Sequence, residues 1–181
     1  MHLNIEAKLN PTKPQLTAPP ELFADLLVEV LAANDMTARA AVSSFDWRVL
    51  AAVQARTTQI PIGYLSDQRK GQNTVAAHDD KPSPWTNDMH PRDYQDSVPR
   101  MRRAAGGTVW SPDFHSLEQG ALHEAHALGL RVIVWTANSP ADIEQMIGMG
   151  VDGVISDYPE RVREAASRLG LQVAAATSTV P

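Results

Sequence analysis

Residues 131–159, RVIVWTANSPADIEQMIGMGVDGVISDYP, decide the fold of this chain. The first six of them form a short, apolar, β-branched run, which is typical of a strand buried on both faces. Ser139 and Pro140 predict a helix start, with a hydroxyl at the N-cap and a proline at the first helical position. Gly150 ends that helix, and 151–156 is the next strand. Two strands joined by one helix predict a parallel βαβ unit.

The same alternation of strand and helix extends over most of the sequence, which predicts an α/β fold with a parallel sheet. We expect strands at 3–8, 40–45, 59–65, 107–110, 131–136 and 151–156, and helices at 20–33, 46–56, 116–128, 140–149 and 160–169. Residues 67–95 break the alternation and are expected to form a long excursion, either a cap over a site or a solvated loop. Residues 1–170 are expected to form one domain, and 171–181 a flexible tail.

Composition excludes several classes of protein. The chain of 181 residues carries a formal net charge of −5 without a Lys/Arg cluster, which argues against nucleic-acid binding. It has no cysteine, so disulfides and cysteine-ligated metals are excluded, and a metal site would use oxygen or histidine ligands. No run approaches the roughly 18 apolar residues of a membrane span, and the N-terminus does not resemble a signal peptide. We expect a soluble chain, either cytoplasmic or periplasmic/secreted.

Glu6 and Lys8 stand two residues apart on the first predicted strand, so their side chains point to the same side. Glu6 could bind a hard divalent cation through oxygen, and Lys8 could neutralise a phosphate. An ordinary salt bridge is the more frequent role of an isolated pair of this kind.

Polar and aromatic residues cluster where the last two predicted strands end, and in a parallel barrel that rim carries the chemistry. Trp135 is either core packing or, beside Thr136 and Asn138, a wall of a ligand pocket. Asp157 is either a site residue or the cap of the last helix. The residues expected on this common rim are Glu6, Lys8, Trp135 and the strand ends at Phe45, Leu65 and Trp110.

The histidines give weaker signals. His123 and His126 fall on an outer helix with spacing three, which does not match a zinc-binding helix motif. His115 follows the fourth strand and could face the pocket, whereas His78 and His90 lie in the excursion, where their placement is not predictable.

Four segments, in order along the chain, resemble motifs of the glycerophosphodiester phosphodiesterase family. Residues 4–8, N-I-E-A-K, are similar to the family's N-I-E-x-K strand, and 43–45, S-S-F, to its S-S-F strand end. Residues 135–138, W-T-A-N, are similar to W-T-V-N, and 150–159, G-V-D-G-V-I-S-D-Y-P, to G-V-D-G-I-I-T-D-Y-P.

The resemblance implies a TIM-type (β/α) barrel that is incomplete, because this chain supplies strands three to eight and lacks the first two βα units. It implies metal-dependent hydrolysis of a glycerophosphodiester substrate to glycerol 3-phosphate and an alcohol, with Ca²⁺ or Mg²⁺ as the divalent cation. By the same resemblance Glu6 is a metal ligand, and Lys8 and Trp135 bind substrate.

The departures from the family pattern concern catalysis. The family's H-R-G, E-x-D and H-D segments, which carry two histidines and two further metal ligands, precede the motif that begins here at residue 4. We therefore expect no catalytic histidine in this chain and negligible activity, whether it is a truncated product, a mis-assigned start or half of a complementing pair. The open barrel edges also favour self-association.

Two other functions stay open from the sequence. One is a non-catalytic fragment or interaction module that keeps the pocket walls without the histidines. The other is a related barrel phosphodiesterase of the phospholipase D toxin or phosphoinositide type.

Overall fold

The structure, a computed structural model, describes residues 2–76 and 81–173. The strands are β1 (Leu3–Glu6), β2 (Ala40–Ser44), β3 (Ile62–Ser66), β4 (Val109–Pro112), β5 (Arg131–Val134) and β6 (Gly153–Val154). The α-helices are α1 (Pro20–Ala33), α2 (Trp47–Arg56), α3 (Val98–Ala104), α4 (Gln119–Ala127), α5 (Pro140–Met149) and α6 (Pro159–Arg168). Short 3₁₀ helices are η1 (Pro14–Leu16), η2 (Thr37–Arg39), η3 (Pro91–Tyr94) and η4 (Phe114–Ser116).

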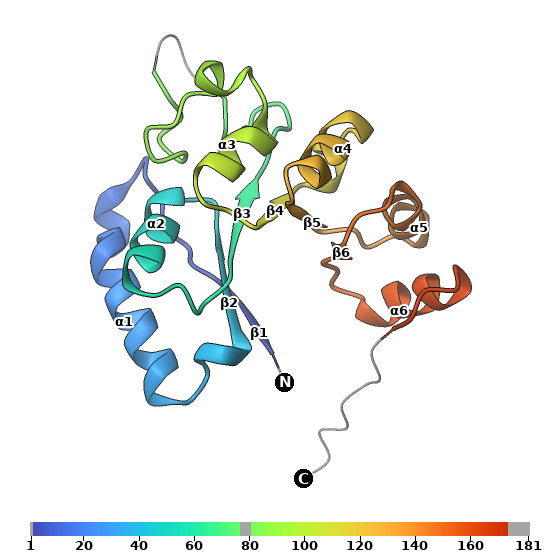
Figure 1. The fold of residues 1–181 in the computed structure, drawn as a ribbon, viewed down its shortest axis with the longest axis horizontal. Coiled ribbons are helices and arrows are strands. Elements are labelled where there is room, and N and C mark those ends of the chain that lie inside the picture. The colour runs from blue at the N-terminus through green and yellow to red at the C-terminus, as the bar shows by residue number, and fades with distance from the viewer. Residues whose placement is uncertain (1, 77–80, 174–181) are drawn as a thin grey trace.

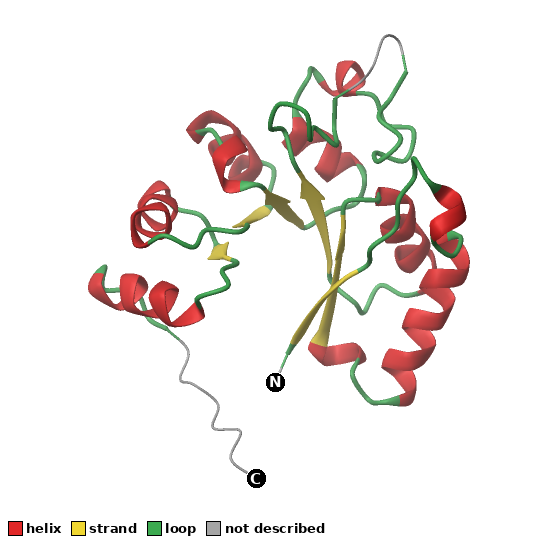
Figure 2. Cartoon of the chain, turned by 180° about the vertical axis from the view of Figure 1, so that it is seen from behind, coloured by secondary structure: helices red, strands yellow, loops and turns green. Residues whose placement is uncertain are grey.

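The six strands form one parallel sheet in the order β1-β2-β3-β4-β5-β6, and the helices lie along its outer side (Figure 1). Among the described residues, β1 and β6 each pair with a single strand, so the sheet curves into an arc that does not close (Figure 2). This topology confirms the predicted α/β class and the incomplete barrel.

The core lies between the sheet and the helices. Alternate strand residues point outward, so Val42, Tyr64 and Trp110 are buried against the helix layer together with Trp47 and Leu50. Trp110 donates its indole N–H to Ser66 Oγ at 3.0 Å in this layer. The strand end at Trp110 was expected on the rim. The Trp110 side chain itself lies in the helix layer, because its register on β4 turns it away from the barrel interior.

Local sequence signals place both ends of α5 and the start of α2. Ser139 Oγ accepts the Asp142 N–H at 3.1 Å, and Gly150 at φ 93° ends α5 in the left-handed conformation that glycine tolerates. Asp46 caps α2 in the same way by accepting the Arg48 N–H at 3.0 Å.

Three elements differ from the sequence-based expectation. β6 holds only Gly153–Val154, although Asp152 and Ile155 N–H groups also donate to β5 at 2.8 Å each. β3 begins at Ile62, since Pro61 has no N–H to donate to a sheet ladder. The helix α3 was not expected, because Arg102 lies beside Met101 on its buried face and interrupts the apolar pattern that predicts a helix.

Some expectations concern residues that the structure does not describe. His78, Asp79 and Asp80 fall outside the described residues, as do positions 174–181 of the predicted tail. Within 2–76 and 81–173, no helix combines the length and the apolar character that a bilayer crossing requires.

Candidate active site

A cavity of about 420 Å³ opens at the carboxyl ends of the strands, on the inner side of the sheet. Its lining residues come from the first three strands and from the segments that follow β1, β2, β5 and β6: Asn4, Glu6, Lys8, Ser43, Phe45, Leu65, Trp135, Thr136 and Ile155. The structure thus brings together the predicted residues Glu6, Lys8 and Trp135, which lie far apart in the sequence. Active sites of parallel barrels occupy this end of the strands.

Glu6 and Lys8 reach the cavity because the end of β1 is locked to β2. The Ala7 N–H donates to the Ser43 carbonyl at 2.8 Å, and Ser44 Oγ donates to the Ala7 carbonyl at 2.6 Å. Ala7 is thereby buried against β2, and its two neighbours project together on the opposite side. Lys8 Nζ lies 2.8 Å from Glu6 Oε1, and the Lys8 side chain is 78% exposed. The pair is a solvated ion pair at the cavity mouth.

Trp135 forms a fixed wall of the cavity. Its indole N–H donates to the Ser111 carbonyl at 2.8 Å, and its ring meets the edge of Phe45 with centroids 5.3 Å apart. The Trp135 backbone continues the β4–β5 pairing through a bridge to Asp113. Phe45 and Trp135, each at a strand end, therefore orient one another.

Arg69 lies between two buried carboxylates beside Trp135, and this arrangement was not predicted from the sequence. Arg69 donates to Asp67 from Nε at 3.0 Å and from Nη2 at 2.5 Å, and its Nε lies 3.6 Å from Asp113 Oδ2. The hydrogen bond to Asp67, opposed by burial and assisted by Asp113, raises the pKa of Arg69. The guanidinium carbon stands 6.0 Å from the Trp135 ring centroid. Asp67 and Asp113 directly follow β3 and β4, so strand-end position is the signal that could have found them.

The remaining rim residues serve mainly to join loops. Asn138 Oδ1 accepts from Ser156 Oγ at 3.0 Å and from the Asp157 N–H at 2.9 Å, while Asn138 Nδ2 donates to Asp157 Oδ2 at 2.8 Å. Asp157 does not cap α6, because the N-cap residue is Tyr158 and no side chain caps that helix. These bonds hold the β5–α5 and β6–α6 loops together beside the cavity.

The described histidines lie outside the cavity lining. His115 Nδ1 is 3.2 Å from Asp113 Oδ1, and the ring stacks on Phe114. His90 caps η3, accepting the Arg92 N–H at 3.1 Å, and lines a different cavity. His123 and His126 are exposed on α4, where His126 pairs with Asp152 at 2.9 Å.

The carboxylates of the described residues do not form a metal site by themselves. Residues 2–76 and 81–173 contain no group of three or more His, Cys, Asp or Glu side chains placed to hold a metal ion. Glu6 is the carboxylate that lines the rim cavity, and its close partner there is the Lys8 ammonium. A divalent cation at Glu6 therefore requires ligands beyond this described set.

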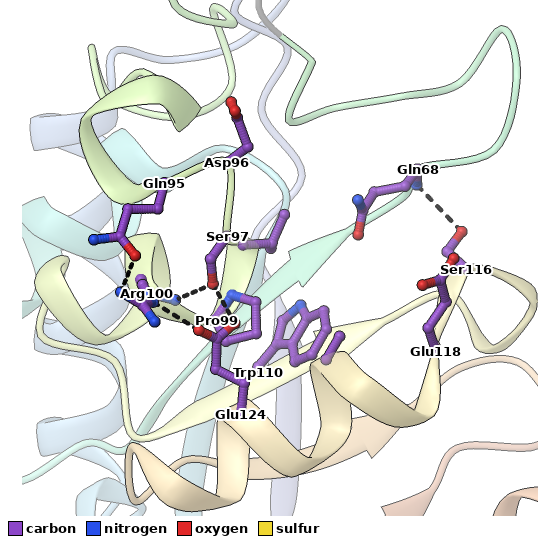
Figure 3. Close-up of a pocket in the computed structure, with 12 residues that line it drawn as sticks. Gln68, Gln95, Asp96, Ser97, Pro99, Arg100, Trp110, Ser116, Glu118 and Glu124 are labelled. Atoms are coloured by element: carbon purple, nitrogen blue, oxygen red, sulfur yellow. Dashed lines mark hydrogen bonds and ion pairs between the residues drawn. The ribbon is translucent and has the colours of Figure 1, made fainter.

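A second cavity, of about 390 Å³, lies outside the sheet between α3 and α4. Figure 3 shows Ser97 and Arg100 directed at Glu124, which accepts from Ser97 Oγ at 2.5 Å and from Arg100 Nε at 2.6 Å. These two bonds, Ser97 first, lower the pKa of Glu124. The Glu124 carboxylate is therefore already paired with protein groups, and this second cavity lies on the helix side of the sheet. The rim cavity, at the carboxyl ends of the strands, is the candidate active site.

Residues 1–161 match the model of the glycerophosphoryl diester phosphodiesterase family. A Silicibacter pomeroyi protein assigned as a glycerophosphoryl diester phosphodiesterase is 29% identical with a TM-score of 0.76, over 94% of this chain and 52% of that one. No curated protein matches the chain.

Two further structures support the fold. A glycerophosphodiester phosphodiesterase from Parabacteroides distasonis is 19% identical with a TM-score of 0.64, over 92% of this chain and 58% of that one. A phosphodiesterase from Oleispira antarctica, solved with the product sn-glycerol-3-phosphate, is 19% identical with a TM-score of 0.63, over 92% of this chain and 56% of that one. The chain thus spans little more than half the length of these structures. With the family model covering most of its sequence, the chain belongs to the glycerophosphoryl diester phosphodiesterase family.

Proposed function

We propose that the rim cavity is one part of an active site that hydrolyses glycerophosphodiesters to glycerol 3-phosphate and an alcohol. The observation that carries this proposal is the meeting of Glu6, Lys8 and Trp135 around one cavity at the carboxyl end of a parallel sheet. A carboxylate, an ammonium and an aromatic wall match the three needs of such a substrate, which are a cation site, a phosphate contact and an apolar surface.

Lys8 is the residue that contacts the phosphate in this proposal. Its ammonium is solvent-accessible and can contact an anion in the cavity when it leaves Glu6. Trp135, held by Ser111 and Phe45, keeps its ring in place against the glycerol or the leaving alcohol. The product complex of the Oleispira antarctica phosphodiesterase supports glycerol 3-phosphate as the ligand to test.

Glu6 is, in this proposal, one ligand of a divalent cation, Ca²⁺ or Mg²⁺, whose other ligands are supplied from outside the described residues. Both cations prefer oxygen ligands. A cation bound there would stabilise negative charge on the phosphoryl oxygens.

The proposed reaction uses histidines for proton transfer, and no histidine lines the described cavity. General acid–base catalysis contributes typically about 10²–10⁴-fold to a rate. The chain as given is therefore expected to hydrolyse its substrate negligibly, and the same chain completed by the first two βα units of a family barrel is expected to be active.

The test compares these two proteins directly. The chain of 181 residues, and the same chain preceded by the first two βα units of the Silicibacter pomeroyi protein, are assayed for release of glycerol 3-phosphate from glycerophosphocholine with Ca²⁺ or Mg²⁺. Metal-dependent turnover by the completed protein alone supports the proposal. Ordinary turnover by the chain alone would contradict the proposal that the catalytic histidines belong to the first two βα units. A completed protein that folds but is inactive would contradict the proposed reaction.

A further inference from the structure

The strands β2, β3 and β4 each lead into the same local arrangement, an aspartate followed two residues later by a basic side chain. The aspartate Oδ1 accepts the backbone N–H of the basic residue at 2.9–3.0 Å, and the carboxylate also contacts the basic side chain. The pairs are Asp46–Arg48, Asp67–Arg69 and Asp113–His115. All three aspartates are buried, so each holds its basic partner at a fixed place beyond the strand end.

The pairs that follow β3 and β4 meet at Asp113, next to the aromatic wall of the rim cavity. Asp113 Oδ1 lies 3.2 Å from His115 Nδ1, and its Oδ2 lies 3.6 Å from Arg69 Nε. Asp113 also forms a backbone bridge with Trp135, and the Arg69 guanidinium carbon stands 6.0 Å from the Trp135 ring centroid. Two basic side chains therefore flank one buried carboxylate beside Trp135, which lines the cavity.

Arg69 offers a hydrogen-bond donor at this place. Its Nε and Nη2 are occupied by Asp67, and Nη2 also donates to Gln72 Oε1 at 2.8 Å. Its Nη1 makes no hydrogen bond to any residue that the structure describes, and the Arg69 side chain is 39% exposed. A guanidinium held on two of its nitrogens presents the third in a fixed direction.

His115 offers the complementary acceptor. A carboxylate only accepts hydrogen bonds, so in the neutral imidazole the contact with Asp113 is made by the Nδ1–H, and Nε2 keeps a lone pair. Within residues 2–76 and 81–173, Nε2 has no hydrogen-bond partner, and the side chain is 59% exposed. The ring lies against Phe114, with centroids 3.7 Å apart, which restricts its orientation.

We propose that Arg69 and His115 form a subsite for the alcohol portion of the substrate, and that this subsite selects alcohols with hydroxyl groups, such as glycerol or inositol, over choline. The inference rests on the proposed function, because Trp135 is the wall that the subsite shares with the rim cavity. A hydroxyl group can accept from Arg69 Nη1 and donate to His115 Nε2. The trimethylammonium group of choline can do neither, and it would leave both protein groups unpaired.

Arg48 provides an internal comparison for Arg69. It is bound by Asp46 in the same way, and its side chain is 34% exposed. Its charge, however, interacts with Glu21 of α1 and with Asp88, and the item of the rim that distinguishes Arg69, the contact with Trp135, belongs to Arg69. If these arginines only fixed their loops, the two would be equivalent. Arg48→Gln is therefore the matched control for Arg69→Gln.

The test uses the full chain of 181 residues and the free alcohols as probes. myo-Inositol and choline are titrated separately, and binding is followed by saturation-transfer difference NMR. We expect myo-inositol to bind with a dissociation constant of about 1–10 mM, which is ordinary for so small a ligand, and choline to bind at least about fivefold more weakly. Arg69→Gln should weaken myo-inositol binding by at least about fivefold, and Arg48→Gln should leave it unchanged.

Three outcomes overturn the proposal: no detectable binding of myo-inositol to the full chain, equal affinities for myo-inositol and choline, or equal weakening by the two arginine substitutions. No hydrolysis is measured, so an inactive completed protein would refute the proposed function without deciding this experiment.

A second variant applies if Arg69→Gln does not unfold cooperatively. His115→Phe keeps a ring against Phe114 and removes both ring nitrogens. It should weaken binding of myo-inositol by at least about threefold and leave that of choline unchanged, because choline has no hydroxyl hydrogen bond to lose at the trimethylammonium end. An unchanged affinity of His115→Phe for myo-inositol would contradict the proposal.

Discussion

The ammonium of Lys8 lies 2.8 Å from the carboxylate of Glu6 at the mouth of the rim cavity. The two groups proposed to hold a phosphate and a cation are thus each other's partners when neither ligand is bound. A cation that binds Glu6 takes over the role of Lys8 there and frees the ammonium for the phosphate. Cation and phosphate binding are therefore expected to favour one another.

Lys8→Gln in the completed protein should lower kcat/KM about tenfold, because it removes the charge proposed to contact the phosphate. The effect should be moderate, since the Lys8 side chain is 78% exposed and water screens its charge. Lys13→Gln, an exposed lysine on the following loop, is the matched control and should leave kcat/KM unchanged. Equal effects of the two substitutions would contradict the proposal that Lys8 contacts the phosphate.

Trp135→Ala in the chain as given should lower the free energy of unfolding by about 2–3 kcal/mol, because a half-buried indole loses its packing on Phe45. Trp135→Phe should cost only about 1 kcal/mol, since it keeps an aromatic ring and loses the hydrogen bond to the Ser111 carbonyl. Urea denaturation of both variants measures the difference. If the phenylalanine variant is as unstable as the alanine variant, the ring contact with Phe45 does not contribute to the free energy of unfolding.

Alkaline pH should destabilise the protein through Tyr64. Burial raises the pKa of Tyr64 to about 12, with the Arg102 guanidinium opposing the shift, whereas an ordinary tyrosine titrates near 10. The folded state holds this proton more tightly than the unfolded state. Tyr64 therefore makes its full contribution to the free energy of unfolding below pH 10. About 2–3 kcal/mol of that contribution is lost as the pH rises to about 12.

The measurement is the slope of the free energy of unfolding against pH between 10 and 12, the interval fixed by the Tyr64 pKa. Tyr64→Phe should flatten this slope, and Tyr158→Phe, which alters an exposed tyrosine, should not. An unchanged slope in Tyr64→Phe would show that Tyr64 does not control the alkaline limb.

Arg102→Met should keep or raise the stability of the chain by about 1 kcal/mol or more. Arg102 is fully buried with its guanidinium 3.4 Å from the Trp47 ring centroid, and Nη2 donates to the Leu65 carbonyl at 3.2 Å. Its Nε and Nη1 have no hydrogen-bond partner among the described residues, and burial lowers its pKa well below the usual value. Methionine keeps the volume and removes the unsatisfied donors. Arg102→Ala, which leaves a cavity, is the contrast and should lower stability by about 2–5 kcal/mol. Equal losses in the two variants would show that the buried charge is stabilising.

Much of the fold was predictable because its signals are local. The Ser139 cap, the Gly150 stop and the apolar run before Trp135 each specify their own piece of backbone, and the structure confirms the βαβ unit that they predict. The four family motifs then gave the order of the strands. Glu6, Lys8 and Trp135 could be placed on one rim because strand ends of a parallel sheet meet there.

The parts that were missed depend on contacts between distant residues. Nothing near Arg102 in the sequence indicates a buried arginine, because its environment is made by Trp47 and Tyr64 from other elements. Likewise, Arg69 acquires its place beside Trp135 only when β3 and β4 bring Asp67 and Asp113 together.

The measurement that tests the account most directly is the metal dependence of Glu6→Ala in the completed protein. Glu6 is on the cavity rim, and removing it should raise the Ca²⁺ or Mg²⁺ concentration needed for half-maximal activity by at least about tenfold, since a missing carboxylate ligand leaves the cation weakly held. His123→Ala, an exposed residue on α4, should change activity by no more than about twofold. Full activity of Glu6→Ala at low metal concentration would contradict the assignment of this carboxylate to the cation site.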